Sequence, residues 1–149
     1  MALNPELLET MSGEEFVGLV KGTSDKEIRD DFAGEHRVQL LDAIFARFPH
    51  QFRPEKAGDR SARIDFRVTG GPGDTSDTYG VVVDHGTCTV EKGAGENPDL
   101  SLMLGPAEFL KLITGTGNPV MMFMTGKVKA RGDLGLASGL ANWFEAPKG

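Results

Sequence analysis

The sequence predicts an α+β fold in which a five-stranded, mostly antiparallel sheet is covered on one face by helices. The spacing of apolar residues in three successive parts of the chain predicts it. Apolar residues follow a helical spacing up to Phe48, they alternate with polar residues from Ser61 onward, and helical spacing returns after Gly105. A chain of 149 residues is long enough to bury one sizeable core of this kind.

Helix-start signals recur in the N-terminal third of the chain. Pro5 begins a short stretch of periodic apolar residues. Two capping boxes follow, Ser12 with Glu15 and Ser24 with Glu27, in which a serine hydroxyl and a carboxylate three residues later satisfy free backbone N–H groups. Each box therefore predicts a short helix.

A longer helix is expected to run from near Glu35 to Phe48, where Pro49 stops it because proline has no N–H to donate. Its buried face is expected to carry Val38, Leu41, Phe45 and Phe48, with Leu40 and Ile44 beside it.

Five strands and two later helices follow from the spacing of the remaining apolar residues. Glycine-rich turns separate the first three strands, which predicts an antiparallel meander. A proline at the first helical position suits the helix after Gly105, and Asp133 suits the N-cap of a final helix. The strands are expected at 61–68, 78–84, 87–91, 100–104 and around Val128 and Ala130.

Charge and composition exclude several classes of protein. The net charge of −6 argues against a nucleic-acid-binding surface, which needs concentrated positive charge. The basic stretch from Lys127 to Arg131 alternates with apolar residues, so we expect the solvated face of a strand, with contact to anionic lipid headgroups as the lesser reading. The single cysteine forms no intrachain disulfide, no apolar run approaches the ~20 residues that span a bilayer, and the N-terminus lacks a secretory pattern. A cytoplasmic protein is expected.

The residues that could carry catalysis are few. His36, His50 and His85 show no metal-ligand spacing, and Cys88 alternates inward on a strand like a small core residue. No serine stands in a nucleophile elbow. We therefore expect no catalytic residue, no metal site and no cofactor.

The unusual feature is the segment from Val120 to Met124, which is apolar at every position. So short a helix cannot bury all of its sides against one sheet. Methionine is unbranched and adapts to irregular apolar shapes. These residues either fill the core or lie against a ligand, another helix or a second subunit, and the sequence leaves these readings open.

The order of motifs in the C-terminal two thirds resembles the sterol carrier protein domain, also called the non-specific lipid-transfer domain. The likeness covers about Val38 to Glu145, and no single motif is diagnostic. The Gly71-Pro72-Gly73 turn and the strands Tyr79 to Asp84 and Cys88 to Glu91 fit the pattern of this family. The likeness rests mainly on a series of later motifs, in this order: Pro98-Asp-Leu-Ser-Leu-Met-Leu, Phe109-Leu, Leu112, Thr114-Gly115, Asn118-Pro119, Phe123-Met124, Gly126-Lys127-Val-Lys129, Gly132-Asp-Leu-Gly135-Leu-Ala137 and Leu140.

The resemblance implies a two-layer sandwich with an apolar tunnel between the sheet and the C-terminal helices. It implies non-catalytic binding and transfer of fatty acid, fatty acyl-CoA, sterol-like lipid or phospholipid, with at most transient membrane contact. The lipid-binding residues it implies are Leu102, Leu104, Phe109, Leu112, Ile113, Val120, Met121, Phe123, Met124, Val128, Leu136, Leu140, Trp143 and Phe144, with Ala130 beside them on the sheet.

Residues 1–34 precede the usual start of such a domain, so we expect an N-terminal helical extension packed on a lipid-binding domain at 35–149. Phe16, Val20 and Phe32 would cover the tunnel mouth or form a homodimer contact. Two alternatives to a lipid carrier remain. One is a dimerisation or protein-interaction module that uses the same apolar surface. The other is an enzyme, which would need a pair of titratable groups inside the pocket.

Overall fold

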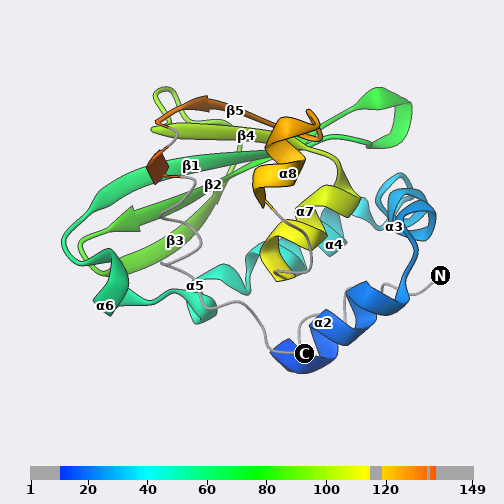
Figure 1. The fold of residues 1–149 in the computed structure, drawn as a ribbon, viewed down its shortest axis with the longest axis horizontal. Helices are drawn as coiled ribbons and strands as arrows, with labels where there is room; N and C mark the ends of the chain where they lie inside the picture. The colour runs from blue at the N-terminus through cyan, green and yellow to red at the C-terminus, as the bar shows by residue number, and fades with distance from the viewer. Residues whose placement is uncertain (1–10, 115–118, 134, 137–149) are drawn as a thin grey trace.

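The computed structural model describes residues 11–114, 119–133 and 135–136, and in this part of the chain one sheet carries helices against one of its faces (Figure 1). The predicted α+β class is therefore confirmed. The helices are α2 (Gly13–Gly22), α3 (Asp25–Phe32), α4 (Arg37–Phe45), α5 (Phe48–Gln51), α6 (Pro54–Ala57), α7 (Pro106–Thr114) and α8 (Pro119–Met124). The strands are β1 (Ser61–Val68), β2 (Asp77–Asp84), β3 (Thr87–Lys92), β4 (Leu100–Leu104) and β5 (Val128–Gly132).

The strands lie in the order β3-β2-β1-β4-β5. β1 pairs with β2, β2 with β3 and β4 with β5 in antiparallel fashion, whereas β1 and β4 are parallel. The expected mostly antiparallel, five-stranded sheet is confirmed. β1 and β4 are parallel because the segment 93–99 carries the chain from the β3 edge across the polar face, where the backbone N–H of Gly95 donates to Asp65 Oδ2 (2.9 Å).

The helix starts predicted at the two serines are confirmed. Ser12 Oγ accepts from the backbone N–H of Glu15 (3.1 Å), and Glu15 Oε1 accepts from the backbone N–H of Ser12 (3.3 Å). Ser24 Oγ likewise accepts from the backbone N–H of Glu27 (3.2 Å). These bonds satisfy donors that the first helical turn leaves free. The stretch expected to begin at Pro5 lies outside the described residues.

The prediction for the next helix was wrong in its end and in one residue of its buried face, Val38. α4 ends at Phe45, and Pro49 lies in the first turn of the separate helix α5, where its missing N–H costs no bond. Val38 is 47% exposed. The expected Leu41, Phe45 and Phe48 are buried, as are Leu40 and Ile44 beside them, and Arg37 is buried where Val38 is not.

Arg37 is buried, and its guanidinium joins α4 to the β1–β2 connection. Nε donates to Asp77 Oδ2 (2.7 Å), Nη2 donates to the carbonyl of Val68 (2.6 Å), and Nη1 donates to the carbonyls of Phe32 (2.9 Å) and Thr69 (3.2 Å). A buried charge is tolerated when its donors find acceptors in this way.

An aromatic cluster fills the space between the sheet and the helices. The ring of Phe45 stacks on Tyr79 (4.3 Å between centroids), on Phe109 (5.0 Å) and on Phe48 (5.1 Å), and Phe66 meets it edge-on (5.8 Å). These rings come from α4, α5, β1, β2 and α7. Aromatic pairs at such distances stabilise a core beyond their area of burial.

The opposite face of the sheet is polar, but it is not uniformly solvated. Asp65 of β1 lies on this face and is nevertheless buried. Its carboxylate accepts from Arg63 Nε (2.8 Å) as well as from Gly95, and the Arg63 guanidinium also contacts Glu91 and the carbonyl of Gly93. The 93–99 connection covers this network.

The described part of the N-terminal extension packs against the rest of the chain. α2 and α3 lie beside α7 (Figure 1), and Lys111 Nζ on α7 contacts Asp25 Oδ2 on α3 (2.9 Å). The Arg47 guanidinium lies over the ring of Phe16 (4.8 Å). Phe16, Val20 and Phe32 are buried within the single chain, so these side chains are not displayed to a second copy.

Candidate functional site

The helix-facing side of β4 and β5 forms the floor of the candidate site. Leu102 lies opposite Ala130 and Leu104 lies opposite Val128 in the sheet register, so all four side chains lie on one face. Leu102, Leu104 and Val128 are buried, whereas Ala130 packs against the core and remains partly exposed.

α7 packs on the same apolar core, where the ring of Phe109 meets Phe66 of β1 edge-on (5.9 Å between centroids). Phe109 and Leu110 are buried, whereas Leu112 and Ile113, in the last turn, contact the core and stay partly exposed. The structure thus places the α7 residues of the expected site on the inner layer. Leu110 is also fully buried, although it was not among the expected site residues.

α8 turns its apolar side chains in different directions. Met122 is buried and Phe123 is half-buried against the core, whereas Met121 is 54% and Met124 is 77% exposed. Met121 and Met124 therefore do not lie on the inner layer with the other expected residues. A segment apolar at every position carries no periodic signal to show which side faces inward.

The remaining expected wall residues belong to the C-terminal region. Leu136 is buried, and Gly135 N donates to Asp133 Oδ1 (3.0 Å), as expected if Asp133 caps a helix. Leu140, Trp143 and Phe144 lie outside the described residues, as does the side chain of Val120.

The inner face of the sheet is apolar beyond these residues as well. Its central strands are buried, but at the edges Cys88 and Val90 of β3 and Ala130 of β5 are only partly buried. Burial raises the pKa of the Cys88 thiol to about 11, so this cysteine is protonated and unreactive at neutral pH. Cys88 therefore acts as a small apolar side chain.

Tyr79 of β2 brings a phenol group into the apolar layer between the sheet and the helices. Tyr79 Oη donates to Asp42 Oδ1 (2.6 Å), and Asp42 Oδ2 accepts from Lys92 Nζ (3.0 Å). Burial, and after it the hydrogen bond to the Asp42 carboxylate, raises the pKa of Tyr79 above its ordinary value. The phenol stays neutral, so this group does not provide acid–base chemistry near neutral pH.

A serine, an aspartate and a histidine meet on the surface at the β2–β3 turn, a grouping not expected from the sequence. Ser61 Oγ donates to Asp84 Oδ1 (2.8 Å), and His85 Nδ1 contacts the same oxygen. In a catalytic triad the serine lies at Nε2, opposite the nitrogen that the carboxylate holds. Here Ser61 lies 3.4 Å from Nδ1 itself, and all three residues are exposed, so the arrangement is not a nucleophile with its base.

Within the described ranges, no group of three or more histidine, cysteine or acidic side chains could hold a metal ion. No helix in the part of the chain that the structure describes is both long and apolar enough to cross a bilayer.

Comparison with known proteins identifies relatives of the whole sheet-and-helix unit. A profile of the SCP-2 sterol transfer family matches residues 41–145. Sterol carrier protein 2 of Bos taurus is 30% identical over 118 residues, which cover 79% of this chain and 18% of that protein. The chain spans less than a fifth of the length of the curated relatives it matches.

Solved structures share the fold. The palmitated SCP2L2 of Aedes aegypti matches with a TM-score of 0.54 and 20% identity, covering 73% of this chain and 95% of that one. The sec-alkylsulfatase Pisa1 of Pseudomonas sp. matches with a TM-score of 0.62 and 16% identity, covering 76% of this chain and 18% of the enzyme. The same fold thus occurs alone and within a longer enzyme chain.

The family profile covers most of the chain and includes the apolar layer formed by β4, α7, α8 and β5. This chain belongs to the SCP-2 sterol transfer family, whose general function is the binding and transfer of lipids.

Proposed function

We propose that this chain is a non-catalytic carrier that binds one apolar lipid between the inner face of its sheet and the helices α7 and α8. The observation that carries the proposal is that several apolar side chains of the sheet edges, α7 and α8 pack on the core and yet keep part of their surface exposed: Leu112, Ile113, Phe123, Ala130, Cys88 and Val90. A lipid tail laid against them would complete their burial.

The proposed wall is the expected set with Cys88 and Val90 of β3 added and with a different choice among the methionines of α8. Met122 joins it because it is buried, while the exposed Met121 and Met124 do not line it in this structure. Leu140, Trp143 and Phe144 remain proposed members from the C-terminal segment. The whole set is aliphatic or aromatic apart from the methionines and Cys88, so it provides shape rather than hydrogen-bond readout, and the choice of lipid is loose.

The driving force for binding is partition of the tail out of water. Each buried methylene contributes about 0.8 kcal/mol, so ten of them contribute roughly 8 kcal/mol before the costs of ordering the lipid. Fatty acyl chains are the cargo we propose, and a palmitated relative of the same fold supports that choice. Fatty acyl-CoA, phospholipid and sterol-like ligands share the apolar tail or ring on which the proposed site depends.

The direct test is lipid binding by the full chain. Native mass spectrometry after gentle purification should show a species heavier by the mass of one lipid. Titration with cis-parinaric acid should give a saturable fluorescence increase that palmitate competes away. A clean unliganded mass together with no parinaric acid binding would overturn the proposal.

A further inference from the structure

α8 displays apolar surface in an unusual way. Only three large apolar side chains of the described residues are exposed, and two of them, Met121 and Met124, lie on this six-residue helix. Their spacing of three places them on the same side of the helix. The third, Val38, belongs to α4.

Positive charge follows directly after these methionines. Lys127, Lys129 and Arg131 are all exposed, and within the described residues none of them forms an ion pair. Arg67 of β1 lies two strands away from Lys129 in the sheet register, with Met103 between them, and is also exposed. The whole chain has a net charge of −6, so this concentration of cations runs against its overall sign.

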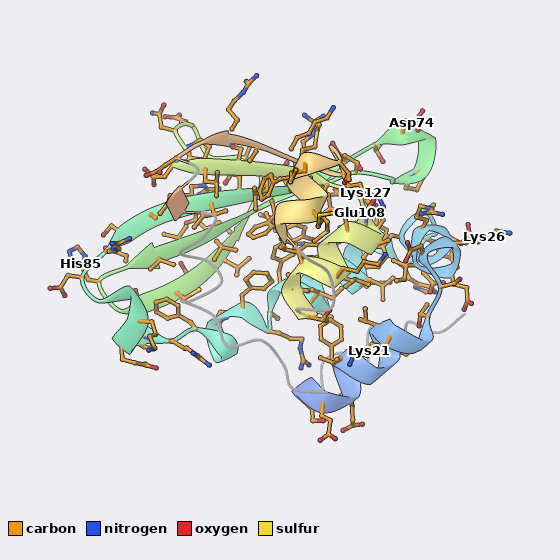
Figure 2. All side chains as sticks on the ribbon, in the orientation of Figure 1. Lys21, Lys26, Asp74, His85, Glu108 and Lys127 are labelled. Atoms are coloured by element: carbon orange, nitrogen blue, oxygen red, sulfur yellow. The ribbon has the colours of Figure 1, made fainter. Side chains whose placement is uncertain are left out.

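The methionines and the cations flank the same edge of the sheet, with α8 on its inner side and with Lys129 and Arg131 on the outer face of β5, where they alternate with Val128 and Ala130. β5 is the edge strand, and α8 packs beside it (Figure 1). Figure 2 shows Lys127 next to α8, with Glu108 of α7 as its labelled acidic neighbour, whereas Lys21 and Lys26 lie away from this edge.

We propose that this α8–β5 edge is the surface by which the protein docks on an anionic lipid membrane. Met121 and Met124 enter the interface between headgroups and acyl chains, and Lys127, Lys129 and Arg131 contact the negative headgroups. The proposal deepens the proposed function, because a membrane is where a carrier collects and delivers its lipid.

Two considerations favour a membrane over a protein partner. Flexible thioether side chains beside lysines suit a fluid interface, where apolar groups insert and ammonium groups reach the headgroups. Two exposed methionines also offer little apolar area, and a stable protein interface buries roughly 1,600 Å² in total. A membrane needs no such matched surface, since each basic residue near an anionic leaflet adds its own attraction.

The test is co-sedimentation of the full chain with vesicles. Vesicles of phosphatidylcholine containing about one third phosphatidylglycerol should bind the protein, and vesicles of phosphatidylcholine alone should bind it weakly. The variant Lys127→Glu/Lys129→Glu should lower the partition coefficient at least about tenfold, because two attractions become repulsions. The matched control Lys21→Glu/Lys26→Glu, with the same change of net charge on α2 and α3, should lower it no more than about twofold.

The apolar contribution is tested separately. Met121→Gln/Met124→Gln should weaken binding that persists at high salt, whereas Val38→Gln, at the other exposed apolar position, should not. Circular dichroism and thermal unfolding of each variant confirm that it is folded.

Several outcomes would overturn the docking surface. These are equal binding to both vesicles, equal loss in the two charge-reversal variants, or a dimer in analytical ultracentrifugation that Met121→Gln/Met124→Gln dissociates. Parinaric acid binding in the absence of vesicles separates this proposal from the previous one. Lys127→Glu/Lys129→Glu should bind parinaric acid like the unaltered chain. A chain that binds anionic vesicles without binding fatty acid retains the docking surface and loses the proposed cargo.

Discussion

The Arg37 guanidinium of α4 donates from Nε to the Asp77 carboxylate at the start of β2 across 2.7 Å, and the two side chains differ sharply in exposure, at 4% and 39%. The arginine is thus the buried member of the pair. Because its other nitrogens donate to backbone carbonyls of Phe32, Val68 and Thr69, this side chain connects three segments of the chain.

Arg37→Met should destabilise the protein by about 3 kcal/mol, because it leaves buried carbonyl oxygens without donors. Asp77→Asn should cost less, about 1 kcal/mol, since the carboxylate is partly solvated and asparagine still offers an acceptor. Urea unfolding followed by far-UV circular dichroism measures both. The control is Arg67→Met, which removes an exposed arginine bonded to Ser76 Oγ and should change stability by less than about 0.5 kcal/mol. A smaller effect at Arg37 than at Asp77 would contradict this account.

Tyr79 is the only tyrosine in the chain, so the absorbance of phenolate reports on it alone. Its pKa is raised in the folded state, which means that folding favours the neutral phenol. The stability from this group is fully present below the unfolded pKa of about 10 and is lost as the pH rises toward the folded pKa.

We therefore expect the phenolate signal at alkaline pH to appear together with loss of circular dichroism. Tyr79→Phe should lower stability by roughly 1 kcal/mol through loss of the hydrogen bond to Asp42. It should also make the free energy of unfolding depend less on pH above about pH 10. A phenolate that forms near pH 10 in a fully folded protein would show that the phenol is not held in this way.

Cys88 should react slowly with thiol reagents while the protein is folded. With a pKa of about 11, roughly one thiol in a thousand is thiolate at pH 8, compared with about one in four for an unperturbed cysteine. We expect modification by 5,5′-dithiobis(2-nitrobenzoate) to be at least about a hundredfold slower in buffer than in urea. Equal rates in the two conditions would show that the thiol is neither buried nor perturbed.

Ala130→Trp tests the proposed wall, because the new side chain would occupy space opposite Leu102 on the inner face of β5. Parinaric acid and palmitate should bind at least about tenfold more weakly, and short-chain fatty acids should be affected less. The control is Lys129→Trp, one residue earlier and on the other face of the strand. Equal losses in the two variants would mean that the effect does not come from the inner face.

Local chemistry made much of the fold predictable, because each serine cap and each alternating strand is encoded within a few residues. The capping bonds of Ser12 and Ser24 are of this kind. The buried positions of Arg37 and Asp65 were not predictable, since their partners Asp77 and Gly95 lie 40 and 30 positions away. A charged residue is expected at the surface until such a partner is known.

The candidate site likewise contains residues whose orientation local sequence predicts and residues whose orientation it does not. Leu102, Leu104 and Val128 were predictable as inward residues, because alternation along a strand fixes the face of each side chain. The exposure of Met121 and Met124 was not, because the direction of an entirely apolar helix depends on what packs against it.

The parallel pairing of β1 with β4 has a consequence for biosynthesis. β1 is the middle strand, yet the chain must be made through β2, β3 and the 93–99 connection before β4 exists to cover its second side. A nascent polypeptide that has left the ribosome only as far as β3 presents a row of unpaired backbone N–H and C=O groups along β1, the kind of edge on which other unfinished chains associate. The central strand of the finished sheet is therefore an unprotected edge strand while the chain is being translated.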